Sequence, residues 1–152
     1  DIVPYAAEQY PQLFKQKEVS VLTVAPERTF WEKATILHHE ANRPERIPMP
    51  KRYSRHYYDL YCMAKSPVKE KAFKQLDLLQ KVVDFKMKFY PRTWARYQEA
   101  VPATIKLSPP SYRLGALQED YTAMQNMLYG EIPSFEVIIE AVRELEKEIH
   151  TL

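Results

Sequence analysis

Lys33 is the first candidate for chemistry, because it is a charged residue in an otherwise apolar helical segment. It lies one turn before Leu37, just beside the apolar stripe of the segment 29–41. One interpretation is that its aliphatic stem covers the edge of the core while the ammonium stays in water. The other is that the ammonium is directed at a phosphate from a helix beneath a cleft. The spacing alone leaves both interpretations open.

Asp59 is the second candidate, in the aromatic segment 52–65. Arg55 precedes it by four residues, so a surface ion pair along one helix face is the simplest interpretation. Such pairs contribute little to stability. Arg52, Arg55 and His56 lie on the same side as Asp59, which makes this face a candidate substrate-binding surface. A carboxylate there could bind Mg²⁺ or orient a nucleotide, although one carboxylate does not make a metal site.

The remaining reactive residue types give no convincing site. His38 and His39 are adjacent, so on a helix they point about 100° apart and do not chelate one ion together. His39 also lies one turn from Arg43, which further disfavours a cation. We therefore predict no metal site. Cys62 has no activating partner in its helical pattern, which predicts a buried structural thiol.

Basic and aromatic residues alternate in the segment 43–55 and just after it. Tyrosines at 53, 57 and 58 interleave with five basic residues there. Aromatic rings among arginines can stack on bases and hold phosphates. The alternative is a solvated loop beside tyrosines that pack in the core. The net charge of the chain is only +2, which is too balanced to imply nucleic-acid binding by charge alone.

Length and composition indicate a compact helical protein. A chain of 152 residues suits one domain and can bury roughly 70% of the surface that its unfolded form exposes. Only two glycines are present, which argues against a β-rich fold and against a glycine-rich phosphate loop. The single cysteine excludes an intramolecular disulfide and favours a reducing, cytoplasmic setting. The sequence has no run of 18 apolar residues and no signal-peptide pattern, so we expect no membrane association.

Hydrophobic periodicity predicts a mainly α fold, a helical bundle with one short N-terminal strand at 19–24. Thr29 and Glu32 match a capping box at the start of the first long helix. Connections after residue 65 are short, so neighbouring helices should pack antiparallel. Gly130 fits the position just beyond a helix end. The predicted helices cover 29–41, 52–65, 69–89, 94–101, 112–129 and 134–149, after a short helical turn within 4–14.

Four stretches carry a family resemblance. PERTFWEKATILHHEANRP, followed by RYSRHYYDLY, resembles the AbiEii/AbiGii-type nucleotidyltransferase toxins of abortive-infection and toxin–antitoxin systems, which act in phage defence. FKMKFY resembles the lysine-containing helix of that family, and LQEDYTAMQNMLYGEIPSFEVIIEAVRELEKEI resembles its C-terminal signature. The resemblance covers nearly the whole chain. It implies that the bundle corresponds to the C-terminal part of a polymerase-β-like nucleotidyltransferase.

The resemblance also implies roles for residues and partners. Lys33 matches a catalytic lysine that contacts nucleotide phosphates, and Asp59 matches an aspartate that supports the site. The implied reaction transfers a nucleotide from an NTP to an RNA acceptor such as tRNA. Mg²⁺ and the NTP are then cofactors of the intact protein. The implied partner is a cognate antitoxin that is a DNA-binding repressor.

The chain departs from the family pattern in one respect. The family has a Gly-Ser loop and an Asp-x-Asp pair, and neither occurs in this sequence. Paired carboxylates hold the Mg²⁺ ions of nucleotidyl transfer. The lone strand at 19–24 likewise needs strand partners for its backbone groups. We therefore expect a C-terminal portion that is inactive alone, a single domain at 1–152 in which 1–65 is a remnant of the nucleotidyltransferase core and 66–152 a helical bundle.

Two other functions remain open at this point. One is a non-catalytic helical interaction module that binds an antitoxin or a partner subunit, which the aromatic-rich helices and the apolar strand at 19–24 favour. The other is a small RNA-binding domain that uses the basic segment 43–55. A monomer without a large apolar patch would count against the first. Binding that is insensitive to salt would count against the second.

Overall fold

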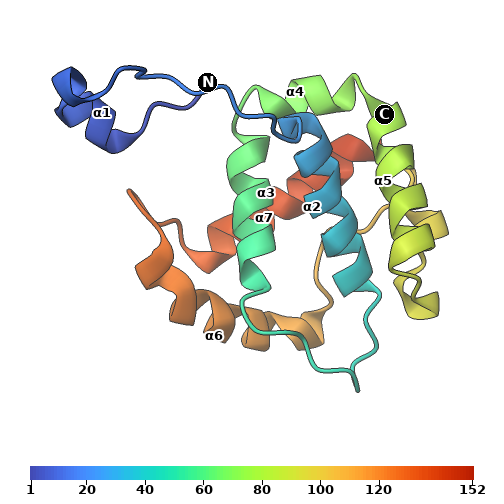
Figure 1. Cartoon of the computed structure of the whole chain (residues 1–152). Helices are drawn as coiled ribbons and strands as arrows, with labels where there is room; N and C mark the ends of the chain where they lie inside the picture. Colours follow the sequence, from blue (N-terminus) through green and yellow to red (C-terminus); the bar gives the residue numbers. More distant parts are fainter.

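The computed structural model describes all 152 residues as a mainly α protein, which confirms the predicted fold class. α2 lies at the centre of the bundle and contacts α3, α4 and α5, while α3 also contacts α6 and α7 (Figure 1). One cluster of 25 buried side chains runs through these helices. None of the helices has the length and the hydrophobicity that a transmembrane span requires. The helices are α1 (Tyr5–Gln9), α2 (Pro26–Ala41), α3 (Ser54–Ala64), α4 (Val68–Phe73), α5 (Leu76–Phe89), α6 (Leu114–Met124) and α7 (Phe135–Ile149).

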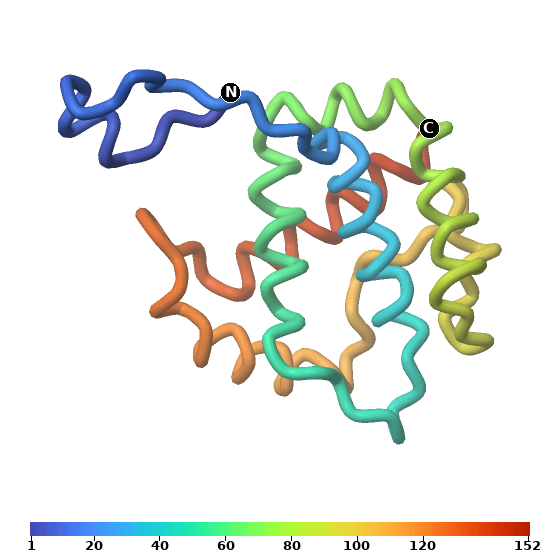
Figure 2. Tube along the Cα trace, in the orientation of Figure 1, coloured from blue at the N-terminus to red at the C-terminus, as the bar shows by residue number.

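The N-terminal segment before α2 projects away from the bundle (Figure 2). Ile2 and Val19 exchange two backbone hydrogen bonds, of 2.9 and 3.0 Å, in an isolated antiparallel bridge. The predicted strand at 19–24 is therefore limited to this one bridge. A strand forms only where a neighbour accepts and donates its backbone hydrogen bonds, and Ile2 provides that neighbour at a single position.

α2 begins at Pro26, three residues before the predicted start. Proline is favoured in the first turn because its missing N–H would have no helical partner there. The predicted capping box does not form: the Thr29 hydroxyl donates to the carbonyl of Ala25 at 3.4 Å, and Glu32 instead pairs with Arg28. The helix ends at Ala41, as predicted.

The predicted helix at 69–89 is divided into α4 and α5 by Lys74 and Gln75. The Ala72 carbonyl accepts the N–H of Gln75 at 2.9 Å and the indole N–H of Trp31 at 3.1 Å. It therefore makes no helical bond to residue 76, and Gln75 leaves the helical region with φ −127° and ψ 57°. The break lets α4 cross the end of α2 while α5 runs along it. Trp31 of α2, which is fully buried, therefore fixes the turn between α4 and α5 through its hydrogen bond to Ala72.

Two further helices are shorter than predicted. The segment after Pro91 forms only 3₁₀ turns at Thr93–Ala95 and Tyr97–Glu99, because Arg96 between them is left-handed with φ 48°. α6 ends at Met124 and is followed by a 3₁₀ turn at Gln125–Met127. Gly130, with φ 76°, therefore lies beyond that turn rather than at the helix end. α7 matches its prediction, with Ser134 as N-cap.

Candidate functional site

Lys33 of α2 and Asp59 of α3 meet between the two helices. The Lys33 Nζ lies 2.7 Å from the Asp59 Oδ2, across 26 positions of sequence. The same ammonium lies 3.2 Å from Nδ1 of His56. The side chains of Lys33 and Asp59 are 21% and 38% exposed, so a ligand can reach them from solvent. Asp59 is therefore paired with Lys33 and not with Arg55, and we call Lys33, His56 and Asp59 the interhelical triad.

His56 is neutral in this arrangement. Burial lowers its pKa to about 4, and the nearby Lys33 ammonium contributes to the shift. Nδ1 therefore accepts a hydrogen bond from Lys33, which leaves the proton on Nε2. The ring of Tyr53 packs edge-on against the imidazole, with 4.9 Å between centroids. A lysine ammonium has three donors. Two are used within the triad, and the third can serve an anionic ligand.

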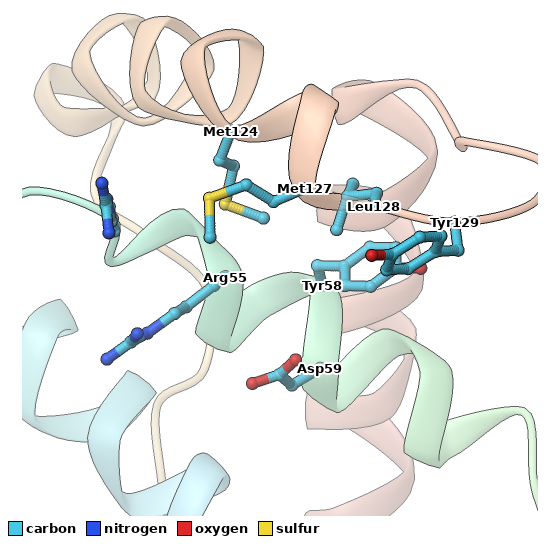
Figure 3. Close-up of a pocket in the computed structure, with 8 residues that line it drawn as sticks. Arg55, Tyr58, Asp59, Met124, Met127, Leu128 and Tyr129 are labelled. Carbon is cyan, nitrogen blue, oxygen red and sulfur yellow. The ribbon is translucent and has the colours of Figure 1, made fainter. Parts of the chain in front are cut away.

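An amphipathic pocket of about 350 Å³ opens beside Asp59. Arg52, Arg55 and Asp59 line one part of it, and an apolar wall from α3, the last residue of α6 and the segment after α6 lines the rest (Figure 3). Ligand pockets in proteins start at about this size and combine an apolar lining with a few placed charges. The wall consists of Tyr58, Met124, Met127, Leu128 and Tyr129. Such a pocket can hold a flat apolar group against the wall and an anion against the arginines.

Arg52 is held in place by Asp120, a residue that sequence reasoning did not single out. Arg52 has a positive φ of 63°, and its backbone N–H donates to Asp120 Oδ1 at 2.6 Å. The N–H and hydroxyl of Ser54 donate to Oδ2 at 2.9 and 2.5 Å. Although burial acts to raise the pKa of Asp120, these hydrogen bonds lower it below the ordinary value. No sequence pattern joins positions 52 and 120, because α6 carries Asp120 to this turn only in the folded chain.

Replacing Asp120 with alanine should therefore destabilise the protein. The change removes three hydrogen bonds and leaves Arg52 in a left-handed conformation that costs energy without them. We expect the free energy of unfolding to fall by about 2 to 3 kcal/mol, measured by urea denaturation. Asp77→Ala is the control, because Asp77 pairs only with the exposed Lys81 and should cause no measurable change. Equal stability of the two variants would contradict the role of Asp120.

The basic segment 43–55 does not form one continuous basic surface. Arg43 is only 6% exposed and makes two hydrogen bonds of 2.8 Å to the carboxylate of Glu40. Its guanidinium also lies over the ring of Trp94, at 4.8 Å from the centroid. Tyr57 is buried as well, and burial raises its pKa. Arg43 and Tyr57 are therefore parts of the core and not of a nucleic-acid surface.

The two adjacent histidines serve as internal links. His38 accepts the backbone N–H of Lys106 at Nδ1 and lies 3.0 Å from the carbonyl of Arg96 at Nε2. His39 contacts the Tyr97 hydroxyl through Nδ1 at 3.1 Å. Burial lowers the pKa of His39 to about 3. Both rings thus tie α2 to the segment that follows α5.

Cys62 is exposed, so the prediction of a buried thiol is wrong. The buried face of α3 consists of Ser54, His56, Tyr57, Leu60 and Tyr61. Position 62 falls outside this face because each residue advances about 100° around a helix. Its hydrophobic neighbours in sequence were therefore a poor guide to its exposure.

The comparisons with known proteins give one match. A protein-family model described as "Nucleotidyl transferase AbiEii toxin, Type IV TA system" matches residues 1–144. No curated protein and no solved structure matches the chain. The matched residues include the interhelical triad, the amphipathic pocket and Asp120.

Proposed function

Because the chain belongs to the AbiEii family of nucleotidyltransferase toxins from type IV toxin–antitoxin systems, we propose that the interhelical triad binds the phosphates of an NTP during nucleotide transfer to an RNA acceptor. The observation that carries this proposal is the contact of 2.7 Å between Lys33 and Asp59, with His56 as a second acceptor, at a partly exposed position. A lysine held in this way is preorganised before the ligand arrives. Preorganised charge is the main source of catalysis in phosphoryl transfer.

Each member of the triad has a distinct role in this proposal. The ammonium of Lys33 donates its third hydrogen bond to a phosphate oxygen, and such charge-assisted bonds are among the strongest in proteins. Asp59 orients the ammonium through their contact of 2.7 Å. Neutral His56 restricts the ammonium from the other side without adding a second positive charge.

The amphipathic pocket accommodates the rest of the nucleotide. Arg52 and Arg55 contact the phosphates, since guanidinium groups bind phosphate in a planar, bidentate manner. The base packs against the apolar wall that includes Tyr58, Met127 and Tyr129. Asp120 acts indirectly, by holding the backbone of Arg52.

The residues of this chain do not make a site for the Mg²⁺ ions that nucleotidyl transfer uses. Asp59 is the one carboxylate that lines the amphipathic pocket, and no group of three or more His, Cys, Asp or Glu side chains is placed to hold a metal ion. The Mg²⁺ and the NTP belong to the proposal for the intact protein.

A labelling assay tests the proposed function. The intact protein is incubated with total cellular RNA and with each common NTP in turn, labelled at the α-phosphate. We expect one NTP to label an RNA band on a denaturing gel, and chelation of divalent cations to abolish the signal. Failure to label RNA with any NTP would refute the proposal.

A second candidate function is binding of the antitoxin through the N-terminal segment. Leu22 is fully exposed, and Val21 and Val24 are more than half exposed, so an apolar extended segment has no partner within the chain. Extended apolar segments bind partners by adding to a sheet edge. Size-exclusion chromatography of the protein mixed with its antitoxin tests this function. Separate elution of the two proteins would exclude it.

A further inference from the structure

A second cavity, of about 330 Å³, lies next to the interhelical triad on the α5 side. Glu32, which lines it, directly precedes Lys33 on α2. Tyr53, which also lines it, packs against His56 of the triad. We call this cavity the α5 pocket. The triad therefore has one pocket at Asp59 and another at Tyr53.

The α5 pocket contains two cations without acidic partners. The ammonium of Lys86 on α5 forms no ion pair and no hydrogen bond within the chain, and burial lowers the pKa of Lys86 to about 8. Glu32, the acid that most affects Lys86, instead pairs with Arg28 at 3.1 Å. Arg92 likewise has no carboxylate partner, and its guanidinium lies 5.7 Å from the ring centroid of Trp94. A partly buried ammonium is costly when unpaired, so Lys86 favours an anionic ligand, and the exposed Arg92 adds a second positive charge to the same pocket.

A third polar group of the pocket also lacks a partner. Nε2 of His39 is buried, lies 3.6 Å from Oε1 of Glu40 and makes no hydrogen bond, while Nδ1 contacts the Tyr97 hydroxyl. Buried polar atoms are satisfied in the great majority of cases. This nitrogen is not exposed to a ligand, but Lys86 and Arg92 both act to lower the pKa of His39, so the two cations lie close to its ring.

Exposed aromatic rings surround these polar groups. Phe85, Phe89 and Tyr90 are 43%, 56% and 60% exposed. The ring of Phe85 lies 4.8 Å from that of Phe89 and 6.1 Å from that of Tyr90. Exposed rings next to unpaired cations are the combination that binds single-stranded nucleic acid, by stacking on bases and neutralising phosphates.

We propose that the α5 pocket binds the unpaired end of the acceptor RNA, with a phosphate on Lys86 and Arg92 and a base on the exposed ring of Tyr90. This proposal rests on the proposed function and extends it, because it places the end of the acceptor in the α5 pocket. The NTP in the amphipathic pocket and the RNA end in the α5 pocket then approach the triad from two sides. A protein partner would not require unpaired cations beside the rings.

Fluorescence anisotropy of the intact protein with a labelled single-stranded RNA of about eight nucleotides tests the proposal. Lys86→Gln should weaken binding roughly tenfold and reduce the slope of log affinity against log salt by about 0.7, the value of one phosphate contact on a single strand. Tyr90→Leu should weaken binding by a similar factor without changing the slope. Lys86→Arg keeps the charge and should retain binding.

Lys81→Gln is the matched control for Lys86→Gln. Both lysines are on α5, but Lys81 is 62% exposed and pairs with Asp77 at 2.7 Å, so its loss should not change RNA affinity. A thermal melt of each variant checks that the fold is retained. A blunt RNA duplex of equal charge offers no unpaired base and should bind more weakly than the single strand.

Three outcomes would overturn the proposal. They are wild-type affinity in Lys86→Gln, equal binding of duplex and single strand, and loss of antitoxin binding with unchanged RNA affinity in Tyr90→Leu. The test does not depend on transfer activity. Lys33→Ala should lose nucleotide transfer and keep RNA binding, so failure of the proposed function is distinguished from failure of this one.

Discussion

Lys33→Ala is expected to lower the rate of nucleotide transfer by the intact protein about 100-fold to 1000-fold, the usual cost of losing one preorganised donor to a developing charge. Asp59→Ala should cause a loss of similar size, because the Lys33 ammonium is then no longer held at 2.7 Å. Steady-state kinetics of RNA labelling give kcat and KM for each variant. If kcat falls while KM stays nearly unchanged, the lost interaction is one that is made only in the transition state.

The double variant tests whether the pair acts as a unit. If Lys33 acts through the position that Asp59 gives it, the double variant should be little worse than either single one. Lys33→Arg keeps the charge with a different geometry, so partial activity is expected there.

The chain offers a matched control for this pair. Lys69 of α4 contacts Glu148 of α7 at 2.8 Å, and the Lys69 side chain is 22% exposed, against 2.7 Å and 21% for Lys33. Lys69→Ala removes an equivalent ion pair far from the triad in the sequence and outside both pockets. It should leave transfer unchanged. If Lys33→Ala were as active as Lys69→Ala, the assignment of Lys33 would be wrong.

Glu40→Ala is expected to lower the free energy of unfolding by about 3 to 5 kcal/mol, as removal of one partner from a buried ion pair does. Arg43 would lose both hydrogen bonds of 2.8 Å while only 6% exposed. The hydrogen bonds to Glu40 raise the pKa of Arg43 above its ordinary value, so the guanidinium cannot escape the cost by losing its proton. Urea denaturation followed by tryptophan fluorescence gives the free energy of unfolding.

Two further tests show whether the loss of stability comes from the buried charge or from any substitution in α2. Glu32→Ala breaks the more exposed pair with Arg28 on the same helix and should cost only about 0 to 1 kcal/mol. Replacing the buried pair together, with Glu40→Leu and Arg43→Met, should recover much of the stability lost in Glu40→Ala. A Glu40→Ala variant that is as stable as Glu32→Ala would show that the pair does not hold α2 to its surroundings.

The helices that the sequence predicted well are those defined by local signals. α3 and α7 follow from apolar periodicity with proline or serine at their boundaries, and α2 ends where the prolines after Ala41 require it. The division between α4 and α5 could not be predicted in this way. It depends on Trp31, which lies 41 positions from Ala72 in the sequence. The indole N–H of Trp31 donates a hydrogen bond to the Ala72 carbonyl, and in a continuous helix that carbonyl would accept the backbone N–H of residue 76.

For the candidate site, residue type and helical spacing were enough to single out the candidate residues, which are Lys33, Arg52, Arg55, His56 and Asp59. The tertiary structure decided their partners. It joined Lys33 to Asp59 where the spacing had suggested Arg55, and it placed the two arginines along an apolar wall. It also added Asp120 and Lys86, which lie in segments quoted for the resemblance but had been given no role of their own. The physical reason is that periodicity assigns a face to each helix, but distances between faces depend on how α2, α3, α5 and α6 pack.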